Sequence, residues 1–382
     1  MKKALVVFLL FALVGTGAFA APTFVWNGHV TGGVAAVSYA NNDDGMVFGT
    51  IAPDSWVNGT RAQLQLSFTN ADRNAGVRAR LRTQTVGGGI ANATGEAAGF
   101  NHSINWHQAW GWVRLFDDIV EARAGRIWDD QLATGDPIFG ASRLEGLHGV
   151  MTYIRPAGDL LTLGFGATSP YNIGNAAEWD AGSLRIWGGA GVNIAGLVFR
   201  AQLDTAYQNT NAQASVNVRL LDGIPIDVFG RFLRLDDFSD AGRMDLRAFV
   251  GLNIFDGMSL NFGGGFSTLA GDNDPHIMVG GWATFAMGAL QPRLDVWFAT
   301  GGQYVYTYGL HAVGSVIDFA AATWNSDQSF LNFRPALRLR AGAGHLELGC
   351  VVNIDLGSVS AVSPHAGTGA TIAPFAAVHM TF

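Results

Sequence analysis

The sequence predicts an all-β chain that closes into an antiparallel transmembrane barrel of about 18 strands. Three observations predict this fold. Polar and apolar residues alternate along segments of about 10 residues, the length that a tilted strand needs to cross a bilayer. Turn residues separate these segments at short intervals. Beyond residue 20 there is no run of roughly 18 apolar residues, which excludes membrane-spanning helices although hydrophobic residues make up 49% of the chain.

The first residues have the composition of an export signal. Lys2 and Lys3 precede an apolar run at 4–14, and the small residues Ala18 and Ala20 fit the site that signal peptidase cleaves. The apolar run is short for a membrane anchor, which needs about 20 residues. We therefore assign 1–20 to a signal peptide. Residues 21–382 are expected to form a single barrel domain, because no linker or change of composition divides them.

The alternation is clearest from Arg61 to Thr69. Its odd positions hold arginine, glutamine, serine and threonine, and its even positions hold alanine, leucine and phenylalanine, so one strand face is polar and the other apolar. Segments of this kind predict strands at 24–39, 60–69, 76–86, 104–115, 119–128, 146–154, 160–168, 183–193, 197–207, 213–220, 224–234, 243–254, 258–267, 276–286, 289–299, 330–340, 345–355 and 371–382. The stretch 300–329 is ambiguous, because it could be a long loop or one further hairpin. The expected range is therefore roughly 16 to 20 strands.

A closed barrel satisfies all of these strands together. Each strand has an apolar face, and no helical segments are predicted that could cover it. Closure turns that face to lipid and leaves no unpaired strand edge. A barrel of roughly 16–18 strands has a lumen too wide for side chains to fill, so the polar face is expected to line water. Tight turns such as Asp256-Gly257 and Gly342-Ala343-Gly344 are expected at one rim, with longer loops at the other.

The last residues alternate and finish in an aromatic side chain, as in the insertion signal of outer-membrane barrels. Ala376, Val378, Met380 and the terminal Phe382 occupy those positions. The whole mature chain resembles the bacterial outer-membrane porin superfamily in its architecture. This resemblance implies short periplasmic turns, long extracellular loops and a place in the bacterial outer membrane. It also implies outer-membrane lipids and the barrel-assembly machinery as partners, the latter through Phe382, and it allows a homotrimer.

The resemblance further implies that the third long loop folds into the lumen as a constriction. By order of appearance this loop is 129–145, which contains Asp129, Asp130, Asp136 and Glu145. Arginines are expected to face it. Three of them share one face of a single predicted strand, and others project inward from further strands: Arg78, Arg80 and Arg82, then Arg123, Arg231, Arg243, Arg247, Arg334, Arg338 and Arg340.

Two interpretations of these charges stay open. Opposite charges across a narrow pore orient polar solutes and set an ion preference, because a low-dielectric wall screens them poorly. Alternatively, the arginines pair with inward acids and only brace the wall. The acids that could do so include Asp204, Asp227, Asp245 and Asp295.

The predicted function is that of a channel for passive diffusion of ions and small hydrophilic solutes. The excess of arginine favours anions, whereas the acidic loop opposes that preference. A substrate-selective channel is one alternative, and saturable flux would distinguish it. A surface adhesin or structural barrel with a plugged lumen is another, and it would conduct nothing. The sequence does not name the solute.

The sequence gives little support for enzymatic activity, for a cofactor or for binding of nucleic acid. Both lysines of the chain lie in the signal peptide, and the net charge is −7 even with them, so there is no basic face for phosphates. The single Cys350 cannot form an internal disulfide. No nucleophile elbow or HExxH pair occurs, and His345 with Glu347 would make only a weak two-ligand pair. We therefore expect no enzymatic activity, no cofactor and no metal site.

Overall fold

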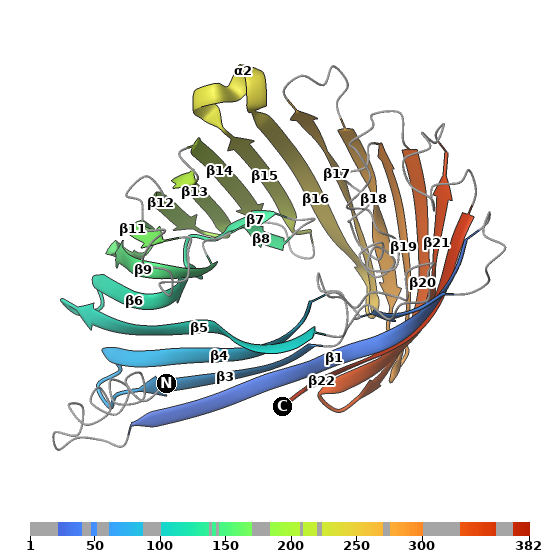
Figure 1. The fold of residues 1–382 in the computed structure, drawn as a ribbon, viewed down its shortest axis with the longest axis horizontal. Coiled ribbons are helices and arrows are strands. Elements are labelled where there is room, and N and C mark those ends of the chain that lie inside the picture. Colours follow the sequence, from blue (N-terminus) through green and yellow to red (C-terminus); the bar gives the residue numbers. More distant parts are fainter. Residues whose placement is uncertain are drawn as a thin grey trace.

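The structure is a computed structural model. It describes residues 22–39, 47–51, 61–86, 101–136, 140–142, 145–169, 184–206, 209–219, 224–269, 276–300, 329–356 and 370–382. These residues form a closed antiparallel β-barrel (Figure 1). Its sheet has 19 strands, but β2 and β3 follow one another along the same edge of β1, which leaves 18 around the lumen. The predicted fold class and strand count are confirmed.

Every predicted strand has a counterpart in the wall. The wall strands are β1 (Thr23–Tyr39), β3 (Arg61–Thr69), β4 (Ala75–Val86), β5 (Asn101–Leu115), β6 (Val120–Trp128), β9 (Glu145–Ile154), β11 (Leu161–Ser169), β12 (Arg185–Ile194), β13 (Leu197–Ala206), β14 (Asn209–Val218), β15 (Ile226–Leu233), β16 (Arg243–Phe255), β17 (Met258–Leu269), β18 (His276–Phe285), β19 (Leu290–Thr300), β20 (Ser329–Ala341), β21 (Gly344–Asp355) and β22 (Ala370–Thr381). The sequence did not predict the short elements β2 (Val47–Ile51), β7 (Thr134–Asp136), β8 (Gly140–Ser142), β10 (Pro156–Asp159), η3 (Leu235–Asp237) and α2 (Phe238–Ala241). The signal peptide and residues 301–328 lie outside the described residues.

The alternating pattern separates an apolar exterior from a polar interior. In the β12–β13 pair, Ile186 and Leu203 point outward and are 59% and 58% exposed, whereas Asp204 points inward and is buried. Most of the large exposed hydrophobic side chains lie on the outer faces of wall strands, as a lipid-embedded surface requires. Among the described residues, no helix is long and apolar enough to span a membrane.

The barrel closes where the first strand meets the last. β1 pairs antiparallel with β22, with His29 opposite Thr381 and Gly33 opposite Ala377. A Cβ atom at Gly33 would lie 2.5 Å from the Cα of Ala377, so glycine permits the close approach of the two strands. Phe382 bonds back to β1 through its amide, which donates to the Gly28 carbonyl at 3.0 Å. The end of β22 is therefore bonded to the first part of β1, near one rim.

Tight turns occupy that same rim, as predicted. The β12–β13 turn consists of Ala195 and Gly196 with φ values of 44° and 88°, the left-handed conformation that a two-residue hairpin needs. The β16–β17 turn uses Gly257 at φ 84° in the same way. The long connections on the other side lie largely outside the described residues.

One strand departs from regular alternation. β5 has a bulge at His107, because Arg80 pairs with Gln108 while the next residue, Leu81, pairs with Trp106. Regular alternation would place Trp106 on the same face as Trp110. The extra residue reverses the parity, so Trp106 lies at the register position of an outward residue.

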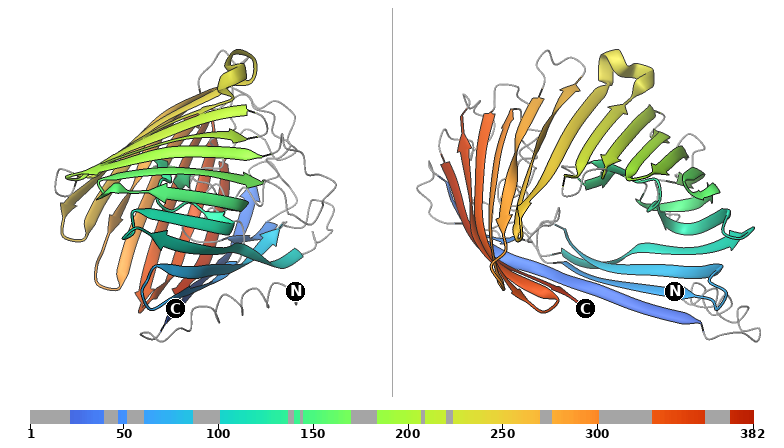
Figure 2. Two further views of the ribbon diagram at one scale, coloured as in Figure 1. Left: turned by 90° about the vertical axis from the view of Figure 1, so that its left-hand side faces the viewer. Right: turned by 180° about the vertical axis from the view of Figure 1, so that it is seen from behind.

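The height of the wall varies around the barrel. β1 contains 17 residues, whereas β11 contains 9 (Figure 2). The interior of the short side carries a small apolar core made of Trp110, Ile127, Leu132, Met151, Tyr153 and Trp187. A porin-sized lumen does not need such a core. Leu132 lies beyond the end of β6, so the segment that follows this strand packs against the wall there.

Candidate functional site

The loop after β6 packs against the inner wall. Residues 129–136 leave β6 and run along the inside of the barrel, where β7 contacts β13, β14 and β15 (Figure 1). Arg200 Nε donates to the carbonyl of Gln131 at 3.1 Å, and the side-chain amide of Gln202 donates to the carbonyl of Leu132. Residues 129–136 of the predicted loop 129–145 therefore lie against the inner wall. Residues 137–139 and 143–144 lie outside the described residues.

Asp129 anchors this loop. Its Oδ1 accepts hydrogen bonds from the backbone N–H groups of Leu132 (2.9 Å) and Gln131 (3.1 Å) and from the Tyr153 hydroxyl (2.7 Å). Its Oδ2 accepts from the Gln202 amide at 2.8 Å. The side chain is fully buried, and this burial raises the pKa of the Asp129 carboxyl, although the donated hydrogen bonds act in the opposite direction. Asp129 thus holds the loop and does not face open lumen.

Leu132 fits into a socket of glycines on the short wall. A Cβ atom at Gly164 or Gly191 would lie 2.7 Å from a methyl carbon of Leu132, and one at Gly189 would lie 3.2 Å away. The leucine side chain is completely buried. Burying it contributes about 2 kcal/mol to docking of the loop. Any larger side chain at the first two glycine positions would collide with it.

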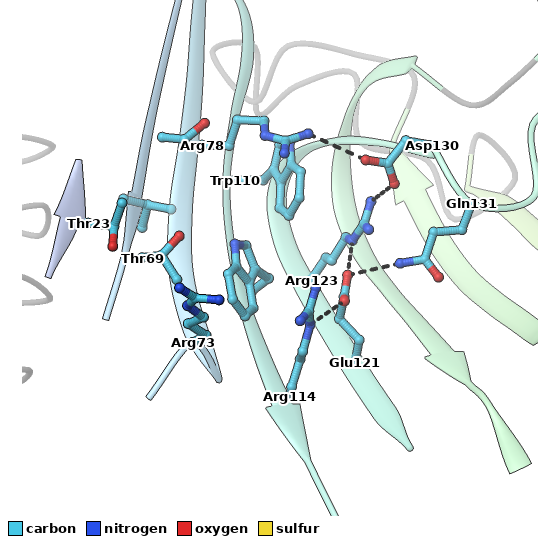
Figure 3. Close-up of a pocket in the computed structure, with 13 residues that line it drawn as sticks. Thr23, Thr69, Arg73, Arg78, Trp110, Arg114, Glu121, Arg123, Asp130 and Gln131 are labelled. Atoms are coloured by element: carbon cyan, nitrogen blue, oxygen red, sulfur yellow. Dashed lines mark hydrogen bonds and ion pairs between the residues drawn. The ribbon is translucent and has the colours of Figure 1, made fainter. Parts of the chain in front are cut away.

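Asp130 joins the loop to two strands of the wall. Its Oδ1 accepts from Arg123 Nη1 of β6 at 2.7 Å, and its Oδ2 accepts from Arg78 Nη1 of β4 at 3.4 Å. Both Asp130 and Arg78 are about one-third exposed, at 36% and 34%. The structure thereby brings together three predicted site residues from separate segments, as Figure 3 shows.

Arg123 lies between two aromatic rings. Its guanidinium carbon is 4.5 Å from the Trp110 ring centre and 4.7 Å from that of Tyr153. Both distances are within the range of cation–π attraction. Arg123 Nε also donates to Glu121 at 2.7 Å. The side chain is almost fully buried, so its orientation is fixed on every side.

Glu121 is shared by three arginines. Besides Arg123, Arg114 Nε donates to Glu121 Oε2 at 2.9 Å and Arg155 Nη2 at 3.2 Å. The loop reaches the same carboxylate, because the Gln131 amide donates to it at 3.2 Å. Three guanidinium groups around one buried carboxylate leave this part of the wall formally positive. Glu121 therefore holds the arginines in place without cancelling their charge.

These groups line a hollow of about 590 Å³ on the inner wall (Figure 3). Trp110 and Trp112 form its apolar side, and Arg114 lies over the Trp112 ring at 4.7 Å. Hydroxyl groups of Thr23, Ser67 and Thr69 complete the rim. The hollow can hold a small anionic or hydroxyl-bearing solute against indole and guanidinium groups.

The other two arginines of β4, Arg80 and Arg82, lie further along the strand than Arg78. Arg80 donates twice to Gln65, at 2.6 and 3.2 Å, and lies 5.1 Å from the Trp128 ring centre. Arg82 bonds to the ring of His107 at 2.9 Å. The three arginines of β4 thus face one side as predicted, and each contacts a different neighbour.

The remaining predicted arginines form two further clusters around single acids. Asp245 accepts from Arg231 at 2.7 Å and Arg243 at 2.9 Å, and Arg247 lies 3.4 Å away. In the other cluster, Glu347 accepts from Arg334 at 2.6 Å and Arg338 at 2.7 Å. Arg340 donates to Gln291 at 2.8 Å.

Bracing of the wall by ion pairs also occurs. Asp204 accepts from Arg185 at 2.6 Å, Asp227 from Arg219 at 2.7 Å and Asp295 from Arg293 at 2.8 Å. These pairs are one-to-one, whereas the clusters at Glu121, Asp245 and Glu347 hold two or three arginines for each acid. The bracing interpretation therefore fits the one-to-one pairs, and for the clusters, where arginines outnumber the acid, both interpretations stay open.

Two predicted acids take other positions. Asp136 ends β7, where it pairs with Gly140 of β8, and Glu145 begins β9 opposite Trp128. Neither backbone position belongs to the cluster around Asp130. Sequence reasoning missed Glu121, Arg114, Arg155 and Gln202. Glu121 shares its strand parity with Arg123, which was a usable signal, whereas Arg155 follows β9 in a turn and carried none.

Among the described residues, no group of three or more His, Cys, Asp or Glu side chains is arranged to hold a metal ion. The chemistry that the site offers is therefore that of guanidinium, carboxylate, hydroxyl and indole groups. These groups bind and orient polar solutes through hydrogen bonds and charge.

No family model and no curated protein matches the sequence. Solved structures do match. OccK2 (OpdF) of Pseudomonas aeruginosa aligns with a TM-score of 0.59 at 10% identity, covering 96% of this chain and 99% of that chain. OccD3 (OpdP) of the same organism gives 0.55 at 9% identity over 96% and 92%. OccAB4 of Acinetobacter baumannii gives 0.56 at 8% identity over 96% and 99%.

At these identities the likeness concerns the fold. The match extends over nearly the full length of both chains. The wall of 18 strands agrees with that likeness. The chain has the fold of these solved structures, the closed antiparallel barrel that the resemblance in its sequence implied.

Proposed function

We propose that this protein is an outer-membrane porin, a water-filled channel for passive diffusion of ions and small hydrophilic solutes. The observation that carries the proposal is the combination of a closed barrel with a lipid-compatible exterior and an interior of charged side chains. In the clusters at Asp245 and Glu347 the arginines outnumber the acids, so bracing by one-to-one ion pairs does not account for all of them. The loop 129–136 is proposed to narrow the lumen from the side of β11 to β15.

We further propose that the channel prefers anions. In the three clusters at Glu121, Asp245 and Glu347, eight arginines surround three carboxylates. Asp130 and Asp118 also pair with arginines of the first cluster, so the formal charge of the eight arginines and their five acids is +3. Fixed positive charge along a narrow, low-dielectric wall raises the local concentration of anions. Arg78, Arg123 and Asp130 place part of this charge where the loop approaches the wall.

The test is single-channel recording of the purified, refolded barrel in a planar bilayer, with a salt gradient across it. Stable open steps and a reversal potential of the anion-selective sign are expected. A well-folded barrel that conducts nothing would contradict the porin and favour the adhesin or structural barrel. A cation-selective reversal potential would contradict the anion preference while leaving the channel intact.

A substrate-selective channel is the second candidate, and the hollow beside Trp110 and Trp112 favours it. Such a site would bind a small anionic solute as it passes, so flux would saturate and the solute would block ionic current. Titration with small organic anions during the same recording distinguishes the two. A conductance that does not change as the concentration of the organic anion is raised would support simple diffusion.

The proposed partners are supported by the C-terminal Phe382, by the apolar exterior of the barrel and by its closed wall. We propose that outer-membrane lipids surround the barrel and that the assembly machinery inserts it through its C-terminal strand. Assembly into a homotrimer stays a prediction, which the mass of the detergent-solubilised protein would test.

A further inference from the structure

Three histidines stack on the inner wall across the strands where the barrel closes. The ring centres of His345 (β21) and His379 (β22) are 5.3 Å apart with a tilt of 26°, and those of His379 and His29 (β1) are 5.7 Å apart with a tilt of 27°. His345 and His379 are direct cross-strand partners. We call these three side chains the histidine ladder.

The histidine ladder lies close to the rim with the tight turns. His345 follows the turn at 342–343, and His379 stands three residues before the end of the chain. All three side chains are half-buried and share strand parity with inward residues, Thr31 on β1, Glu347 on β21 and Ala377 on β22. The histidine ladder therefore lies on the inner wall close to one mouth of the proposed pore.

Charged neighbours border the histidine ladder at both ends. On one side, Arg340 of β20 pairs in register with His345, and Glu347 two residues along β21 accepts from Arg334 and Arg338. β22 contributes no charged residue beside His379, because Ala377 and Thr381 flank it on the same face.

At the other end, Arg82 of β4 lies in register with His29 two strands away, because both stand opposite Gln63 of β3, and Arg80 precedes it on the same face. β3 lies between, with Gln63 opposite His29 and Arg61 opposite Thr31. The ring of His107 in β5 is bonded to Arg82. Arginines therefore border the histidine ladder on both sides. Glu347, two residues from His345, already binds Arg334 and Arg338, and the terminal carboxyl group of Phe382 accepts a hydrogen bond from the Gly28 amide beside His29.

Histidine is the side chain whose charge ordinarily changes between pH 5 and 8. Positive charges on imidazoles whose ring centres lie under 6 Å apart repel one another, so the protonation of one ring acts on the next. Each proton adds one positive charge to a wall that already carries arginine. We infer that the histidine ladder is a selectivity-determining element that makes the anion preference of the pore increase as the pH falls. This inference rests on the proposed channel.

The first test is the reversal potential between pH 8 and pH 5. In the wild type the anion-to-cation permeability ratio should rise on acidification, by a factor on the order of two. The triple variant His29→Asn, His345→Asn, His379→Asn should lose this rise while keeping its conductance at pH 8, which shows that the barrel is folded. His107→Asn is the matched control and should keep the rise, because its partner Arg82 can only donate. A pH-independent wild type, or an unchanged rise in the triple variant, would overturn the inference.

A second readout does not depend on conduction. Carbon-13-labelled histidine in micelles gives a titration curve for each imidazole. His29 and His345 should titrate over a broad range in the wild type, and each should follow a simple one-proton curve in His379→Asn, because the central ring couples them. Identical curves in both proteins would refute the coupling. A barrel that does not conduct but shows the coupling would instead refute the proposed channel alone.

Discussion

Replacing Asp129 with alanine should release the loop from the inner wall. The carboxylate accepts four hydrogen bonds, two from backbone N–H groups and one each from Tyr153 and Gln202. Each buried donor left without an acceptor costs about 1–3 kcal/mol. The Gln202 amide keeps the Leu132 carbonyl as an acceptor, so three donors lose theirs. Even the low end for these three, about 3 kcal/mol in total, shifts the balance between docked and detached loop by a factor on the order of one hundred. The buried Leu132 side chain contributes about 2 kcal/mol and cannot offset that loss.

Single-channel recording reads out this change. If residues 129–136 narrow the lumen, the Asp129→Ala channel should show larger and noisier open steps than the wild type. Asp129→Asn keeps one acceptor oxygen and should lie between the two. Asp118→Ala is the control, because that side chain is 62% exposed in the β5–β6 turn and lies 3.9 Å from Arg114. Equal conductance and noise in Asp129→Ala, Asp118→Ala and the wild type would refute the argument.

Two further changes test the same wall. Gly191→Val should displace Leu132 from its socket, because a Cβ atom at this position would lie 2.7 Å from the leucine methyl carbon. The variant should therefore raise conductance, as Asp129→Ala does. Unchanged open steps would show that the socket does not hold the loop. Glu121→Gln should lower the free energy of unfolding by about 3 kcal/mol and increase anion preference, because three arginines lose their buried acid. Thermal unfolding measures the first effect and the reversal potential the second. A wild-type melting temperature would contradict the first.

The strands could be predicted because their alternation is a local property. Each wall strand must turn an apolar face to lipid, so its pattern is visible within one segment, and β3 was predicted to within one residue as 60–69 against Arg61–Thr69. The predicted ends of strands that are fixed by pairing with a neighbouring strand were less accurate. β14 spans Asn209–Val218 where 213–220 was predicted, since its polar start resembles a loop.

The site could be predicted only in part. Arg78 and Arg123 were identified by parity, but their meeting with Asp130 depends on the path of the loop, and that path depends on glycines of β11 and β12 whose sequence positions are remote from it. The bulge at His107 likewise leaves no mark in composition. Long-range contacts of this kind are decided by packing, which a strand-by-strand pattern does not contain.

Adjacent acids at the start of the loop tie the width of the pore to its charge. Asp129 binds the β9 and β13 side through Tyr153 and Gln202, whereas Asp130 binds Arg78 and Arg123 on β4 and β6. Detaching the loop would therefore remove an acid from two arginines as it opens the lumen. Asp129→Ala should raise conductance and anion preference together, whereas Asp130→Asn, which leaves the anchor intact, should raise anion preference with little change in conductance. Equal effects of the two variants on both quantities would mean that loop position and wall charge are not separable in this way.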